Sequence, residues 1–162
     1  MILPRACRAC SLAALLLGGC ASTPYTEPKE GPVAQLQVQV RAEGGWKQWT
    51  QVQTFENSQE CSGIRSILKN SPSRQVRIKA ESPASLRFVH VTQSGWPITT
   101  LTSCQLIVTF DPKSNGKYFA EATSKYGRCN ISIRDLENDR LEPSARLREP
   151  VDTVSGAGNL CR

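Results

Sequence analysis

The sequence has little of what catalytic and membrane-spanning proteins need. It contains one histidine, His90, among 162 residues. A Ser-His-Asp arrangement would have to use His90, and the chain has no Gly-x-Ser-x-Gly motif around a nucleophilic serine. A metal site built on several histidines is excluded for the same reason. The apolar run of residues 11–19 is shorter than the roughly 20 residues that a membrane-spanning helix requires.

Carboxylates do not compensate for the shortage of histidine. A glycosidase needs two carboxyl groups that face one cleft, and the spacing of the acidic residues selects no such pair. We therefore expect no enzyme, no metal and no cofactor, with a hydrolase that uses His90 as the alternative. The scattered candidates are Glu43, Glu56, Glu60, Asp111, Glu121, Asp135, Glu137, Asp139 and Glu142.

The first twenty residues form a pattern of their own. Arg5 and Arg8 precede the short apolar run, which ends in Leu17-Gly18-Gly19-Cys20. Basic residues before an apolar stretch that ends in small residues are typical of a cleaved export signal. The end of the run resembles the lipobox of bacterial lipoproteins. That resemblance implies cleavage before Cys20, a diacylglyceryl group on its sulfur and an acyl chain on its amino group.

The same resemblance predicts where the protein resides. Ala21 rather than aspartate after the lipidated cysteine implies sorting to the outer membrane, with the domain facing the periplasm; the inner membrane and the cell surface are the alternatives. Its expected partners are the membrane, through the lipid, and another envelope protein or an anionic envelope polymer. Loss of Arg5 and Arg8 lowers the net charge of +6, and the mild positive charge that remains does not indicate nucleic-acid binding.

Composition divides the chain into three parts. Residues 1–19 are the expected signal peptide. Residues 20–32 hold the lipidated cysteine and a tether rich in proline and small polar residues, which we expect to be disordered. Such a tether reaches roughly 20 Å on average and about 40 Å when fully stretched. Residues 33–162 form a single β-domain.

Four cysteines remain once the signal is removed and Cys20 carries lipid: Cys61, Cys104, Cys129 and Cys161. The periplasm is oxidising, so an even number of cysteines indicates two disulfides. Three pairings are possible, and we favour Cys104 with Cys129, around a local hairpin, and Cys61 with Cys161. A zinc site is the competing interpretation, but this part of the chain has no Cys-x-x-Cys pair.

Apolar and polar residues alternate with a period of two in most of the domain, which predicts β-strands. We expect an all-β fold, an antiparallel β-sandwich or open barrel of about seven short strands, with one short helix near residues 62–70 and a strand there as the alternative. Trp46, Trp49 and Trp96 are expected in the core or in cross-strand pairs. The predicted strands are 33–41, 46–55, 75–81, 86–91, 104–110, 117–123 and 129–134.

Two local arrangements follow from these strands. Gly44-Gly45 predicts a hairpin between the first two strands, and the last three predict a meander. The order Cys104, Phe110-Asp111-Pro112, Gly116-Lys117-Tyr118 and Cys129 resembles a pattern in small bacterial lipoproteins with a disulfide-bonded β-domain. This resemblance covers about 30 residues and implies no activity.

A basic set lies within fifteen residues: Arg65, Lys69, Arg74, Arg77 and Lys79. It predicts either a solvated surface or an anion-binding face for lipopolysaccharide phosphates or peptidoglycan carboxylates. The sequence thus indicates a lipid-anchored envelope protein that acts by binding or as a structural or assembly component. An anionic-ligand module and a hydrolase are the alternatives.

Replacement of Cys20 by alanine tests the anchor. We expect the Cys20→Ala protein to move from the detergent phase to the soluble periplasmic fraction, because no acyl chain would then hold it in the bilayer. Detergent phase partitioning followed by immunoblotting measures the change. Unchanged partitioning would contradict the lipid anchor.

Overall fold

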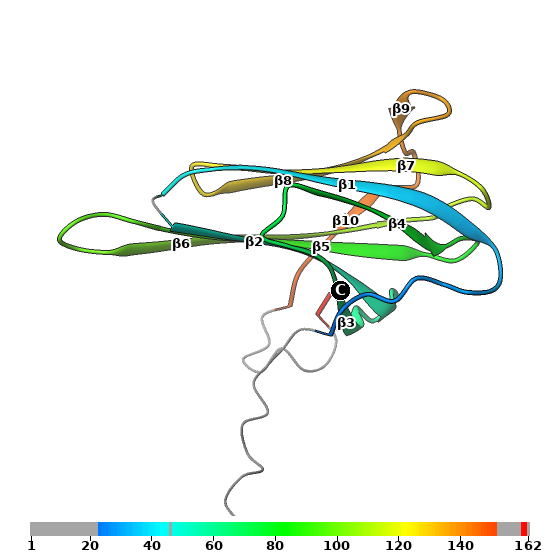
Figure 1. Ribbon diagram of the computed structural model, residues 1–162, viewed down its shortest axis with the longest axis horizontal. Helices are drawn as coiled ribbons and strands as arrows, with labels where there is room; N and C mark the ends of the chain where they lie inside the picture. The colour runs from blue at the N-terminus through cyan, green and yellow to red at the C-terminus, as the bar shows by residue number, and fades with distance from the viewer. Residues whose placement is uncertain (1–22, 46, 152–159, 162) are drawn as a thin grey trace, which may run out of the picture.

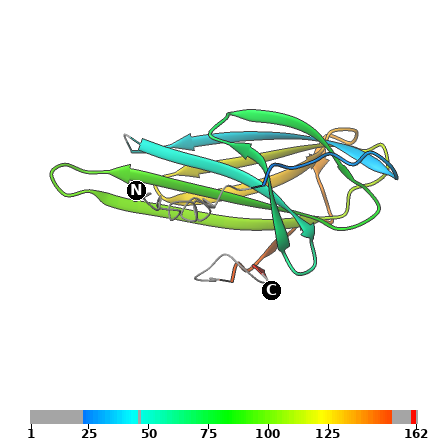
Figure 2. The same cartoon turned by 60° about the horizontal axis from the view of Figure 1, so that its bottom comes forward.

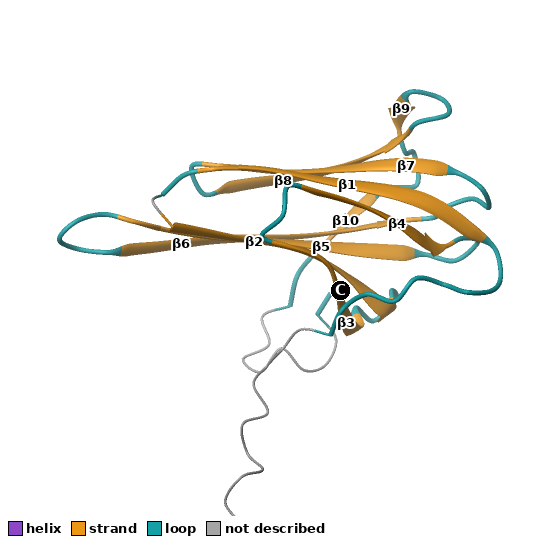
Figure 3. Ribbon diagram, in the orientation of Figure 1, coloured by secondary structure: helices purple, strands orange, loops and turns teal. Residues whose placement is uncertain are grey.

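Strands in which apolar and polar residues alternate form two layers in this protein. The computed structural model describes residues 23–45, 47–151 and 160–161. In it, two five-stranded sheets pack face to face as a β-sandwich and do not close into a barrel (Figures 1 and 3). The described residues contain no helix, and hence none long and apolar enough to cross a membrane.

The two sheets differ in strand order. Sheet I has the order β4-β1-β7-β8-β9, with β4 Ser73–Lys79, β1 Val33–Glu43, β7 Lys117–Lys125, β8 Arg128–Asp135 and β9 Arg140–Leu141. Sheet II has the order β10-β6-β5-β2-β3, with β10 Arg146–Arg148, β6 Thr100–Phe110, β5 Ala84–Ser94, β2 Lys47–Asn57 and β3 Ser62–Lys69.

The predicted hairpin of the first two strands is wrong. β1 pairs antiparallel with β4 and parallel with β7, so both of its edges are occupied within sheet I. Gly44 and Gly45 instead carry the chain across to sheet II, where β2 pairs with β3 and β5. Gly45 has a φ of +61°, and a Cβ there would lie 2.5 Å from the carbonyl oxygen of Gln93. Only glycine fits this crossing without displacing the backbone of β5.

The predicted meander is also wrong in part. β7 and β8 form a hairpin, but β6 lies in the opposite sheet, between β5 and β10. An alternating pattern shows which side chains of a strand point inward, whereas it carries no information about which strand lies beside it.

A β-bulge explains why residues 62–70 resemble a helix in sequence. Val52 pairs with Leu68 and Gln53 with Ser66, so Ile67 is an extra residue in β3. The bulge lets Ile67 and Leu68 both enter the core, while Ile64 packs on the opposite face of sheet II. The spacing of Ile64, Ile67 and Leu68, which is also that of one helix face, thus arises from a bulged strand. The predicted short helix is wrong, and the alternative of a strand is confirmed.

The main core lies between the inward faces of the two sheets. Leu36, Leu86, Phe88 and Phe110 are completely buried there, and the ring of Phe110 meets that of Tyr118 edge-on at 5.2 Å. Full burial of each such side chain contributes about 1.5–3 kcal/mol. This contact between the layers is the main source of the stability of the fold.

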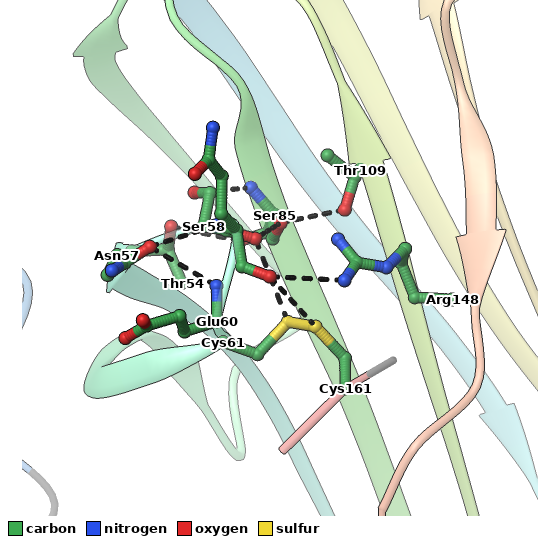
Figure 4. Close-up of a disulfide and its surroundings, with 10 residues drawn as sticks. Thr54, Asn57, Ser58, Glu60, Cys61, Ser85, Thr109, Arg148 and Cys161 are labelled. Carbon is green, nitrogen blue, oxygen red and sulfur yellow. Dashed lines mark hydrogen bonds between the residues drawn. A yellow bond between two sulfur atoms is a disulfide. The ribbon is translucent and has the colours of Figure 1, made fainter. Parts of the chain in front are cut away.

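A second, smaller core covers the outer face of sheet II. Phe55 and Ile107 point outward and are covered by Leu160, Cys61 and Cys161. The Leu160 amide donates to the Cys61 carbonyl oxygen at 3.3 Å. The Cys61–Cys161 disulfide fastens residues 160–161 to the turn between β2 and β3 (Figure 4).

Hydrogen bonds fix that turn in place (Figure 4). Asn57 Oδ1 accepts hydrogen bonds from the amides of Gln59 and Glu60. Ser58 bonds both the amide and the hydroxyl of Ser85, and the Ser85 hydroxyl lies 2.7 Å from that of Thr109. Cys61 is therefore held in position independently of its disulfide.

The second disulfide joins the two layers. Cys104 of β6 in sheet II is bonded to Cys129 of β8 in sheet I, which is the pairing favoured from the sequence. Its role differs from the expected one, because it crosses between the sheets and does not close a local hairpin.

The segment before β1 also differs from expectation. Pro24 forms a parallel bridge with Ser66, the Tyr25 amide donates to the Ser66 carbonyl oxygen at 2.9 Å, and the Ser66 amide donates to the Thr23 carbonyl oxygen at 2.8 Å. Residues 23–25 thus extend sheet II beyond β3, where a disordered tether was predicted. Residues 20–22, which include the cysteine of the predicted anchor, lie outside the described residues.

Removal of one sulfur tests the pairing. We expect Cys104→Ala to leave Cys129 reactive to a maleimide and to lower the free energy of unfolding by about 3.5 kcal/mol, the loop-entropy value for a 25-residue closure. Urea unfolding and peptide mapping of the labelled protein measure the two effects. Labelling at Cys61 or Cys161 instead would show that the pairing differs.

Candidate functional site

The basic set is divided between two edge strands. Arg65 and Lys69 lie on β3 of sheet II, whereas Arg74, Arg77 and Lys79 lie on β4 of sheet I. Along β4, Val76 and Ile78 are buried and Arg77 and Lys79 are exposed. The predicted single face therefore does not form from all five residues.

Three of the five basic side chains have partners within the protein. Arg65 is paired with Glu56, and Arg77 Nε lies 3.0 Å from Glu27 Oε2. Arg74 Nη1 donates to the Ile67 carbonyl oxygen at 2.8 Å, which links β4 to the edge of the opposite sheet. Exposed ion pairs such as the first two contribute only about 0–1 kcal/mol each, so they leave their cations able to exchange partners.

The structure brings Arg65 and Lys79 together at a hollow, which we call the edge hollow. It has a volume of about 510 Å³ and opens between the edges of the two sheets. Such a volume is within the range of small-ligand pockets. Its walls are residues 23–26 and Pro28 from the N-terminal segment, Thr54, Glu56, Ser58 and Arg65 from β2, β3 and the turn between them, and Ile78, Lys79 and residues 82–84 from the β4–β5 side.

The charges of the edge hollow are unbalanced. Arg65 and Lys79 contribute two positive charges and Glu56 one negative charge. Tyr25 supplies an aromatic ring, and its hydroxyl donates to the Arg77 carbonyl oxygen at 3.0 Å. Burial, together with the charge of Glu27, raises the pKa of Tyr25 to about 12, so the hydroxyl stays protonated. The hollow suits a ligand that combines an anionic group with a polar or ring-shaped body.

His90 occupies a different place, between the sheets. The side chain is 1% exposed, and its Nδ1 lies 2.6 Å from the hydroxyl of Ser124, which is 2% exposed. Nε2 has no hydrogen-bond partner in the described structure. A histidine beside a serine hydroxyl has the spacing of a nucleophile and its base, but burial keeps substrate away from both groups.

The carboxylates mainly organise turns. Asp135 accepts hydrogen bonds from the amides of Glu137 and Asn138, and Glu142 accepts from the amide and hydroxyl of Ser144. The hydrogen bond from the Asn138 side chain lowers the pKa of Asp135 below its usual value. Within residues 23–45, 47–151 and 160–161, no group of three or more His, Cys, Asp or Glu side chains is placed to hold a metal ion.

The expectation for the tryptophans is wrong at Trp96, whose side chain is 95% exposed. Trp49 is 38% exposed on sheet II, and Trp46 lies outside the described residues. A strongly exposed indole at a loop tip is unusual, because large apolar side chains normally gain stability from burial.

Comparison with known proteins gives no relative: no family model, no curated protein and no solved structure matches the chain.

Sequence reasoning missed part of the edge hollow. It singled out Arg65 and Lys79, but the wall formed by residues 23–26 was assigned to the tether. No local signal shows that Pro24 bridges Ser66, which lies far along the chain on β3. A segment rich in proline has the composition of a linker whether or not a sheet edge is available to receive it.

The buried histidine predicts a pH dependence of stability. Burial lowers the pKa of His90 below its usual 6.5, so below about pH 6.5 the unfolded chain binds a proton that the folded protein does not. We expect the free energy of unfolding to fall between about pH 7.5 and 5.5, by at most about 1.4 kcal/mol per pH unit. Urea unfolding at fixed salt measures the slope.

The matched variant is His90→Gln, which should be less pH-dependent over the same interval. The pKa of Asp135 is lowered from its usual value of 3.8, so this carboxyl group affects the free energy of unfolding only at pH values below this window. Equal slopes for the wild type and His90→Gln would show that His90 does not resist protonation.

Proposed function

We propose that this chain is an exported bacterial envelope protein, held by lipid on Cys20, that acts by binding and not by catalysis. The observation that carries the proposal is the use of its cysteines. Both disulfides draw only on Cys61, Cys104, Cys129 and Cys161, the four that remain once residues 1–19 are removed as the signal and Cys20 is assigned to lipid. Two disulfides in a small domain support an oxidising compartment.

The proposed location is the outer membrane with the domain facing the periplasm, because Ala21 follows the lipidated cysteine. The inner membrane and the cell surface are the alternative locations. The membrane is then the first partner. A second envelope component remains the expected target of the folded domain.

Among binding functions, we favour recognition of an anionic envelope polymer at the edge hollow. Arg65 and Lys79 line it with an excess of positive charge, and Tyr25 and Ile78 supply apolar contact. Lipopolysaccharide phosphates and peptidoglycan carboxylates both fit this chemistry. Arg65 would exchange its exposed partner Glu56 for the ligand, at little cost to the free energy of folding.

The hydrolase alternative has weaker support. His90 and Ser124 are within hydrogen-bond distance, but both are buried between the two sheets. Catalysis would require the layers to separate, which the Cys104–Cys129 disulfide opposes.

Neutralising the edge hollow tests the ligand. We expect Arg65→Gln with Lys79→Gln to weaken binding of a lipopolysaccharide or a muropeptide by roughly tenfold or more, because one charge-assisted hydrogen bond contributes about 1.5–3 kcal/mol. Isothermal titration with each purified ligand measures the dissociation constants. The binding of the wild type should also weaken as salt is raised.

The control is Arg134→Gln with Lys117→Gln, which removes the same charge from β7 and β8, outside the lining of the edge hollow. Arg134 is ion-paired with Asp139, as Arg65 is with Glu56, so the two variants are matched. Equal weakening by both would assign the effect to net charge alone. Absence of binding to either ligand by the wild type would contradict an anionic polymer as the target.

A further inference from the structure

The β5–β6 hairpin extends beyond the other strands of the sandwich (Figures 1 and 2). Trp96 is 95% exposed, Ile98 80% and Leu101 67%. Beside it lies the β7–β8 turn, where Tyr126 is 85% exposed and a Cβ at Gly127 would approach Thr102 of β6 to 2.9 Å. We call Trp96, Ile98, Leu101 and Tyr126 the apolar tip. Large apolar side chains gathered at one exposed end indicate a contact surface.

The part of the apolar tip on the β5–β6 hairpin can leave water without carrying charge with it. From Phe88 to Phe110 the chain has no Asp, Glu, Lys or Arg. The backbones of β5 and β6 are paired as far as Ser94 and Thr100, so the ladder satisfies the backbone polar groups of the hairpin up to the loop of residues 95–99. Uncharged side chains and paired backbone are the conditions under which a segment can enter a lipid environment.

Cations lie behind the apolar tip. Lys125 Nζ is 5.5 Å from the centre of the Tyr126 ring, and Lys47 Nζ is 5.2 Å from that of Trp49. Arg128 follows at the start of β8 and is exposed. The nearby carboxylate of Glu43 is already paired with Lys125 at 3.1 Å. Apolar residues ahead of lysine and arginine complement a membrane with anionic headgroups.

The position of the anchor brings this end of the domain within reach of the bilayer. Cys20 lies three residues before Thr23, so its sulfur-bound lipid is within about 11 Å of the docked segment. Pro24 bridges Ser66, which is level with Gln53 and, through it, with Arg87 of β5. Trp96 is nine residues farther along, roughly 30 Å away. A bilayer that holds the lipid also reaches the apolar tip when the strands lie nearly parallel to its surface.

We propose that the apolar tip inserts into the headgroup region of an anionic phospholipid membrane and sets the orientation of the domain, an inference that rests on the proposed lipid anchor. Trp96 and Ile98 enter the interface, where amphipathic rings such as indole are favoured. Lys47, Lys125 and Arg128 meet the phosphates. The edge of β3 and the N-terminal segment face the same bilayer, and sheet I lies farther from it except at its β7–β8 turn.

Charge favours lipid over a protein partner as the occupant. A protein surface that receives an indole normally adds polar pairs at the rim, but the apolar tip has no carboxylate of its own to offer, and the charges behind it are mainly positive, with Glu43 paired to Lys125. The docked segment begins only three residues after the proposed lipid on Cys20. The bilayer is therefore close, and the local concentration of phospholipid is high.

Tryptophan fluorescence tests the proposal on the full chain. In a Trp46→Phe and Trp49→Phe background, Trp96 is the only indole. We expect its emission to shift to the blue and to be quenched by brominated acyl chains in phosphatidylethanolamine–phosphatidylglycerol vesicles. The matched control is a Trp-free protein with Leu141→Trp, since Leu141 is 64% exposed on β9 of sheet I; its emission should not change.

A second variant measures affinity. Trp96→Ser with Ile98→Ser should weaken vesicle binding of unlipidated Cys20→Ala protein by about tenfold to a hundredfold, with an unchanged circular dichroism spectrum because both side chains are exposed. Vesicles are used in large excess over protein, so that binding through the apolar tip can be measured without the lipid anchor.

The outcomes separate the two proposals. Wild-type protein that does not float with vesicles lacks the anchor, which overturns the proposed attachment; its Trp96 emission still reports on the apolar tip. Protein that floats while Trp96 stays fully accessible to acrylamide overturns the insertion alone. Protection of Trp96 in native envelopes but not in pure lipid vesicles would assign the apolar tip to a protein partner and overturn the inference.

Discussion

The fold depends on contact between two sheets whose strands come from distant parts of the chain. At one end of the sandwich this contact is apolar, with Leu36, Phe88 and Phe110 completely buried. Toward the other end the inward positions become polar, and His90 meets Ser124. Hydrophobic burial is weaker there, and at that level the Cys104–Cys129 disulfide joins the layers. A covalent bond thus supplements the cohesion between the layers where the side chains contribute less.

The positions of the strands and their buried faces could be predicted from the sequence, because apolar and polar residues alternate within each strand. The seven expected strands are present, and the all-β sandwich is confirmed. Features that depend on which strand lies beside which could not. Nothing local shows that β1 takes β4 and β7 as neighbours, that β6 leaves the expected meander, or that the bulge at Ile67 imitates helical spacing. Of the edge hollow, Arg65 and Lys79 were foreseeable as cations, whereas their shared wall with residues 23–26 was not.

Docking of the N-terminal segment connects the proposed anchor with the proposed binding surface. A free tether of about twelve residues would leave the domain in any orientation within tens of ångströms of the membrane. Residues 23–25 are paired to β3, so a lipid on Cys20, three residues earlier in the chain, would be attached close to one edge of sheet II. The edge hollow is at the same edge, and the same segment forms one of its walls. A ligand in the hollow would therefore be held next to the membrane, which suits a polymer attached to or layered on the envelope.

The exposed side chains of the apolar tip complete this arrangement. Trp96 and Ile98 contribute almost nothing to folding, because their surfaces stay in water in the isolated domain. In solution such a surface promotes aggregation. This tendency disappears only when a membrane or another molecule covers the exposed side chains. One lipid attachment constrains position but leaves rotation about the anchor free. The proposed second contact, roughly 30 Å away along the strands, would remove that freedom and leave sheet I directed away from the bilayer. The two proposed contacts together would convert a tethered domain into an oriented one, and that orientation would determine which ligands can reach the edge hollow.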